Sequence, residues 1–194
     1  ADHTIVVDTC IGNDKPRTYP KWNLMQGDFL ARFAAAGFTT EQVDTVLCTH
    51  MHVDHVGWNT RWVDGRWQPT FPQAQYLFAE DEWHHWRQEA QEYGPVIEDS
   101  VQPIFDAGQA VIVAQQHQVT DEVSLQPTPG HTPGHVSVRI QSRGEVAIIT
   151  GDMIHHPCQI AHPQWSTLAD TDPRAAAQTR GDFLQRYGDL PVLV

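Results

Sequence analysis

Short apolar runs rich in β-branched residues alternate along the chain with segments whose apolar positions recur at helical spacing. The runs predict strands, and the spaced segments predict helices. The predicted strands cover residues 4–8, 45–49, 75–79, 109–114, 123–126, 135–141, 146–150 and 190–194, and the predicted helical segments cover 28–36, 40–43, 80–92, 100–106 and 172–187. Residues 58–67 are expected to form a loop. Strands that alternate with helices, plus one hairpin through 142–145, indicate mixed α/β layers.

Composition narrows the class of protein. A chain of 194 residues with 40% hydrophobic residues suits a single globular domain over residues 1–194. The formal net charge of −12 argues against nucleic acid or an anionic membrane as a partner. No apolar run approaches the length of a membrane span, and no signal peptide is visible. We expect a cytoplasmic protein, and a leader removed before Ala1 stays open as the alternative.

The three cysteines are widely spaced and odd in number, which does not indicate a disulfide framework. Cys48 lies in an apolar run and is expected to be a buried small hydrophobic residue. A ligand role for Cys158 is disfavoured, because no second cysteine stands at a zinc-site spacing.

Potential metal ligands gather in three short motifs, each at or just after a predicted strand. The first reads His-Met-His-Val-Asp-His over residues 50–55, the second Gly-His-Thr-Pro-Gly-His over 130–135, and the third Thr-Gly-Asp over 150–152. Imidazole and carboxylate groups suit zinc and similar divalent ions. His50 and His52 are two positions apart, so an extended segment points both side chains to one side.

These motifs resemble those of the metallo-β-lactamase superfamily, and the chain is most similar to the methyl parathion hydrolase and acyl-homoserine lactonase branches. The resemblance implies an αβ/βα sandwich with two divalent metal ions at the sheet edge. It assigns one ion to His50, His52 and His131, and the other to Asp54, His55 and Asp152. Zinc is the expected metal, with manganese, cobalt and iron as alternatives.

The resemblance also implies roles beside the metals. Asp8, at the end of the first predicted strand, would orient a ligating histidine; the alternative is a carboxylate that caps a turn. His155 stands where acyl-homoserine lactonases have a substrate-contacting tyrosine, which favours the phosphotriesterase-like branch; a structural loop histidine is the alternative. His135 is expected to be a hydrogen-bonded core histidine.

Tryptophans cluster after the first motif. Trp58, Trp62 and Trp67 would line a hydrophobic substrate pocket, or else pack the loop that holds them. Trp83 and Trp86 are three residues apart on one predicted helix and are expected in the core.

The predicted activity is hydrolysis by a hydroxide held between two ions, with Asp54 holding the nucleophile and passing a proton to the leaving group. The substrate would be a small hydrophobic lactone, carboxylic ester or phosphotriester. The alternatives are a glyoxalase II-like thioester hydrolase and a non-catalytic metal-binding protein of the same fold. A homodimer is left open.

Related dinuclear enzymes carry a seventh ligand, a histidine on the strand after the last helix. That position would fall beyond Val194, and residues 4–8 resemble an internal strand of the family. We therefore expect a partial domain that lacks edge pieces at both termini and binds the second ion weakly.

Overall fold

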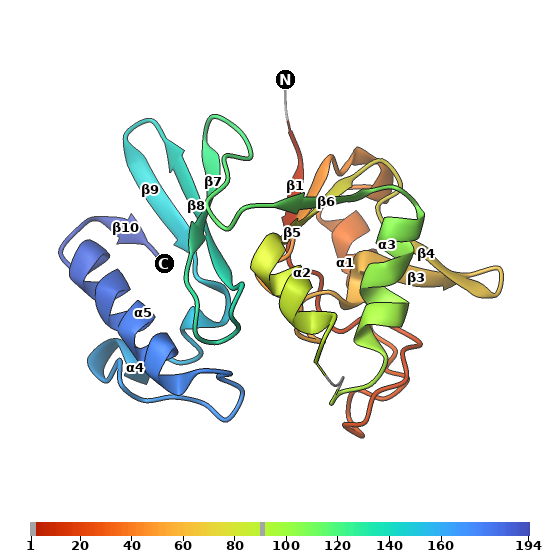
Figure 1. Ribbon diagram of the computed structural model, residues 1–194. Helices are drawn as coiled ribbons and strands as arrows, with labels where there is room; N and C mark the ends of the chain where they lie inside the picture. The colour runs from red at the N-terminus through yellow and green to blue at the C-terminus, as the bar shows by residue number, and fades with distance from the viewer. Residues whose placement is uncertain (1–2, 90–91) are drawn as a thin grey trace. The chain divides into compact units, whose positions relative to one another are not determined.

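The computed structural model describes residues 3–89 and 92–194, and its elements are labelled in Figure 1. The chain divides into two compact units. The first comprises residues 1–78 and 86–112, and the second comprises residues 79–85 and 113–194. The single domain expected from the sequence stays a prediction. Within the described ranges, none of the helices combines the length and apolar character that crossing a bilayer requires.

The first unit is built on a four-stranded sheet in the order β1-β2-β5-β6. Its strands are β1 (Ile5–Val7), β2 (Thr45–Leu47), β5 (Gln75–Ala79) and β6 (Ala110–Val113). The pairs β1–β2 and β2–β5 are parallel. All three residues of β2 are buried, as its continuous apolar run predicts for a central parallel strand. The first ligand motif begins three residues after β2 ends.

Short helical segments connect these strands: α1 (Phe29–Ala35), the 3₁₀ turn η1 (Thr40–Gln42), α2 (Glu80–Trp86), a π-helical turn η3 (Ile97–Val101) and α3 (Gln102–Asp106). Thr39 and Gln42 form a capping box that fixes the start of η1. The helix expected over 80–92 ends at Trp86, and residues 90 and 91 of that span lie outside the described residues.

The prediction of a loop over residues 58–67 is wrong. After the 3₁₀ turn η2 (Gly57–Asn59), the chain forms an antiparallel hairpin of β3 (Thr60–Val63) and β4 (Arg66–Pro69). Asp64 and Gly65 connect the strands with φ angles of 51° and 79°. Positive φ at both central residues is what a two-residue hairpin turn of this hand needs, and Asp-Gly is its usual sequence. The signal was therefore present in the sequence.

The second unit carries a sheet in the order β10-β9-β8-β7. Its strands are β7 (Val123–Pro127), β8 (Val136–Ser142), β9 (Glu145–Ile149) and β10 (Val192–Leu193), and the predicted hairpin joins β8 to β9. The helix α5 (Pro173–Tyr187) is capped by Asp172, whose side chain accepts hydrogen bonds from two backbone amides. A short helix that the sequence did not predict, α4 (Cys158–Ala161), precedes it. Phe183 packs α5 onto Ile148 and Met153.

Candidate metal centre

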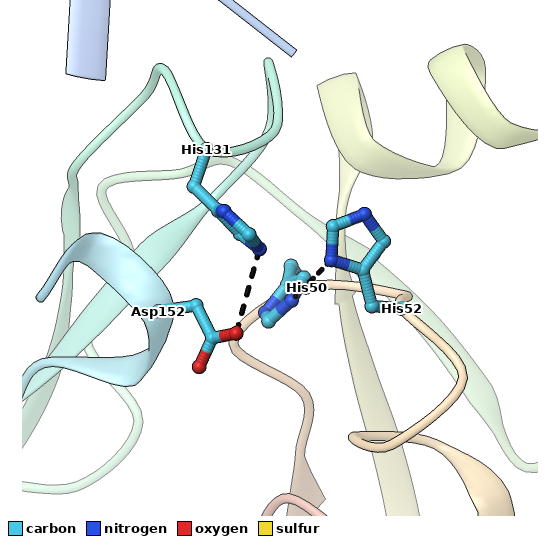
Figure 2. A group of neighbouring side chains, drawn as sticks. All are labelled: His50, His52, His131 and Asp152. Atoms are coloured by element: carbon cyan, nitrogen blue, oxygen red, sulfur yellow. Dashed lines mark hydrogen bonds and ion pairs between the residues drawn. The ribbon is translucent and has the colours of Figure 1, made fainter. Parts of the chain in front are cut away.

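The first motif places its histidines directly after β2. His50 is fully buried, and its Nε2 lies 3.0 Å from Nδ1 of His52 (Figure 2). The two rings meet edge to face, and the ring of His52 also meets the edge of Trp86 with centroids 5.2 Å apart. Atoms that share a tetrahedral zinc with bonds of about 2.0–2.2 Å lie roughly 3.3–3.6 Å apart. The two nitrogens are thus close to the spacing that a common ion requires.

Asp8 holds the second part of this motif. Its Oδ1 accepts a hydrogen bond from the Thr49 amide at 2.8 Å, and its Oδ2 accepts one from the Thr49 hydroxyl at 2.8 Å. The same Oδ2 lies 2.9 Å from Nδ1 of His55. A carboxylate on Nδ1 fixes the ring and turns Nε2 toward a metal. Nε2 of His55 lies 3.8 Å from Oδ1 of Asp54, which is 42% exposed and accessible to a reacting molecule.

A close backbone crossing locks the motif against the segment after β1. The Gly57 amide donates to the Cys10 carbonyl at 2.7 Å, and the Thr9 amide donates to the His55 carbonyl at 2.7 Å. A Cβ on Gly57 would lie 1.9 Å from the carbonyl carbon of Ile11. Only glycine permits this approach, which explains the glycine two residues after the last motif histidine.

The second unit contributes His131 and Asp152. Nε2 of His131 lies 3.5 Å from Oδ2 of Asp152 (Figure 2). Nδ1 of His131 lies 3.0 Å from Oδ1 of Asp170, which is buried. Burial raises the pKa of the Asp170 carboxyl, but the hydrogen bond with His131, the Thr167 amide and the Arg180 charge outweigh it. The pKa therefore lies below its ordinary value, and Asp170 is an ionised partner for His131.

Two further buried side chains support the segments that carry His131 and Asp152. His135 is fully buried; its Nδ1 lies 2.8 Å from the Thr128 hydroxyl, and its Nε2 accepts the Asp152 amide at 3.1 Å. The prediction of a core histidine is confirmed, and His135 also fixes the backbone of Asp152. Glu82 of α2 accepts hydrogen bonds from the Thr132 hydroxyl at 2.7 Å and the Gly134 amide at 3.1 Å.

Asp170 and Glu82 were missed from the sequence. Neither stands in a recognisable motif, and each reaches its partner across a long stretch of chain. Asp170 lies 39 positions from His131, and Glu82 lies 50 positions from Thr132.

The residues expected to contact substrate fall in different surroundings. Trp58 is buried and stacks on Phe29 with ring centroids 5.3 Å apart. For Trp58, this contact agrees with the alternative that the tryptophans pack the segment that holds them. Trp62 and Trp67 face each other across the β3–β4 hairpin. With Asp14 and Pro16 they line a hollow of about 440 Å³ in the first unit. Trp83 and Trp86 are only half-buried, so their placement in the core is wrong; the buried residue of α2 is Glu82.

The donor set fits divalent metal ions. Each unit presents imidazole nitrogens and carboxylates, and in each unit a carboxylate lies on Nδ1 of one motif histidine. In the second unit, His131, His155 and Asp170 place ligand atoms within 4.8 Å of one another. Zinc, manganese, cobalt and iron all accept such ligands.

A model of the metallo-beta-lactamase superfamily matches residues 1–193. The chain belongs to the metallo-β-lactamase superfamily. The resemblance drawn from the three motifs is therefore confirmed, and so is the superfamily fold. Among curated proteins, none matches the sequence.

Solved structures of the superfamily are similar to the chain. Hydrolase AbOPH of the beta-lactamase superfamily is 25% identical to this chain, with a TM-score of 0.77. The match covers 96% of this chain and 65% of the AbOPH chain. A probable metal-dependent hydrolase from Staphylococcus aureus has 21% identity and a TM-score of 0.78, with coverages of 96% and 66%. AidC, a dizinc quorum-quenching lactonase, has 23% identity and a TM-score of 0.75, with coverages of 95% and 65%. The chain thus spans slightly less than two thirds of the length of these proteins.

Proposed function

We propose that this chain is the metal-binding part of a metal-dependent hydrolase that holds two divalent ions. The ligands would be His50, His52 and His131 for one ion, and Asp54, His55 and Asp152 for the other. The proposal rests on one repeated observation: a carboxylate holds Nδ1 of a motif histidine in each unit, Asp8 at His55 and Asp170 at His131. Such partners fix the ring so that Nε2 serves the metal. Membership of the superfamily supports assigning the candidate ligands of the two units to one dinuclear centre.

Bound divalent ions supply an activated water near neutral pH and polarise the bond that is cleaved. The chain's own residues do the rest. Asp8 and Asp170 keep the Nδ1 protons of His55 and His131 in place, so that neither ring turns or changes tautomer. Asp54 takes the proton released as water attacks and delivers it to the leaving oxygen. Its 42% exposed side chain allows both transfers.

The proposed substrates are small hydrophobic lactones, carboxylic esters and phosphotriesters. The likeness to AidC, crystallised with an N-acyl-L-homoserine product, puts lactones first for testing. Ring opening adds one water across the ester bond and yields a carboxylate and a hydroxyl group. Trp62 and Trp67 are the aromatic surface of the first unit that we assign to apolar substrate contact.

The experiment compares zinc-loaded and manganese-loaded chain on an N-acyl homoserine lactone, an aryl ester and an aryl phosphotriester. We expect turnover of at least one of these, and loss of it on chelation. His52→Ala and Asp54→Ala should lower turnover at least about 100-fold with unchanged circular dichroism, since each removes a metal ligand. His84→Ala is the matched control, because His84 lies exposed on α2. Near-normal turnover in either ligand variant would rule the mechanism out. Tight metal binding without any turnover would favour the non-catalytic alternative.

A further inference from the structure

The second unit holds an imidazole beside Asp152 that the six-ligand set does not use. Nε2 of His155 lies 3.2 Å from Oδ2 of Asp152. The same carboxylate oxygen lies 3.5 Å from Nε2 of His131. The rings of His131 and His155 have their centroids 4.8 Å apart at an angle of 63°. Two imidazole nitrogens therefore approach one carboxylate oxygen from two different rings.

These spacings are near those of ligand atoms on a metal ion. Ligand atoms on one tetrahedral zinc are roughly 3.3–3.6 Å apart, which follows from bonds of about 2.0–2.2 Å. The distance of 3.5 Å from Oδ2 falls within this range, and the distance of 3.2 Å lies just below it. Nitrogen–oxygen hydrogen bonds are mostly shorter, at about 2.7–3.2 Å. Both contacts are therefore near the spacing of ligand atoms on a metal, and the 3.5 Å contact is longer than such a hydrogen bond.

The backbone around His155 is fixed on both sides. The His155 amide donates to Oε1 of Gln159 at 2.7 Å. Gln159 is buried and donates in turn to the Trp165 carbonyl at 2.9 Å. Arg180, fully buried in α5, donates to the same carbonyl and to the Met153 carbonyl. His155 therefore stands on a turn held in place from Asp152 to Gln159, as a ligand requires.

Solvent access is adequate for an incoming ion. The side chain of His155 is 24% exposed and that of Asp152 is 26% exposed, while His131 is 1% exposed. The buried ring forms the floor of the arrangement, and the other two ligand groups reach it from the surface.

We propose that His155 is an additional metal ligand, whose Nε2 binds the same ion as Oδ2 of Asp152. This inference rests on the proposed metal centre, and assigns it a seventh protein ligand from within the second unit. His155 then acts on metal affinity first, and on substrate only through the metal.

Cobalt(II) and zinc provide the test on the chain as it stands. His155→Phe should remove one set of hyperfine-shifted imidazole proton resonances from the cobalt-loaded chain. It should also weaken the second zinc by at least about 10-fold in calorimetric titration, since even indirect support of a ligand is worth that much. His155→Asp, which restores a ligand oxygen, should recover part of the zinc affinity without the lost resonances. His156→Phe is the control from the adjacent exposed position and should change neither readout.

The outcomes separate the two proposals. Full zinc affinity and an unchanged set of shifted resonances in His155→Phe would overturn the ligand role and leave the proposed hydrolase standing. Reduced turnover with unchanged metal binding would overturn it as well, because His155 would then serve substrate alone. Failure of the unaltered chain to bind either metal would defeat the proposed function itself, and this inference with it.

Discussion

At the scale of single residues, Lys15 is a fully buried amine outside the proposed metal ligands. Its side chain is fully buried, and Nζ donates to the Thr60 hydroxyl at 2.8 Å and the Asp99 carbonyl at 3.0 Å. Arg17 already forms a two-pronged pair with the Asp99 carboxylate at 2.6 Å and 2.9 Å. Burial lowers the pKa of Lys15 to about 7; Asp99 opposes the shift and Arg17 adds to it. The single negative charge of Asp99 thus faces two cationic side chains, Lys15 and Arg17.

Lys15 should make folding stability depend on pH. Its pKa falls from 10.5 in the unfolded chain to about 7 in the fold, so between these values the unfolded state binds more protons. The free energy of unfolding therefore rises with pH across this window, by at most about 1.4 kcal/mol per pH unit from this group. Urea unfolding from pH 6.5 to 9.5 measures it. The difference between the unaltered chain and Lys15→Met should grow with pH, while the exposed Lys21→Met should give a constant difference. A flat difference for Lys15→Met would contradict the shift.

At the scale of elements, the loop after β7 is seated on the backbone of α2. An ideal Cβ on Gly134 would lie 2.0 Å from the backbone nitrogen of Glu82 and 2.4 Å from its Cα. Neither atom belongs to a flexible side-chain end, so one of the two elements would have to move. The helix α5 offers the opposite case, because a Cβ on Gly181 meets no atom within 4 Å.

These two glycines predict effects of opposite sign. Gly134→Ala should lower the free energy of unfolding by about 2 kcal/mol or more, because it forces overlap with a backbone. Gly181→Ala should raise it by about 0.5–1 kcal/mol, because alanine loses less conformational entropy than glycine on entering a helix. The test compares the urea unfolding midpoints of the two variants with the midpoint of the unaltered chain. Equal midpoints for the two would show that the loop and α2 are not in this close contact.

At the scale of the whole molecule, the acidic net charge leads us to expect no association with nucleic acid. The formal net charge is −12, and two divalent ions would offset only part of it. The metal-loaded chain should therefore leave a DNA duplex unshifted in a gel assay at about 0.15 M salt, because phosphate binding needs a basic surface. Retention of the duplex that weakens as salt rises would contradict this and indicate a nucleic-acid partner.

Much of the fold follows from local sequence. The apolar runs predicted the strands of both sheets, and Asp172, Pro173 and Gly188 predicted the bounds of α5, because these signals act between residues a few positions apart. The same holds for the candidate ligands at 50–55, since they form one compact motif immediately after a buried strand. The β3–β4 hairpin also depends on a local signal, the adjacent Asp64 and Gly65 of its turn.

Only the tertiary structure decided which groups support those ligands. Asp8 reaches His55 across 47 positions, and Asp170 reaches His131 across 39. The sequence suggested the first pair only through family resemblance and gave no sign of the second. It was equally silent on the burial of Lys15 and on the contact between His155 and Asp152. Such pairings depend on the path of the chain through space, and periodicity and local propensity carry no information about that path.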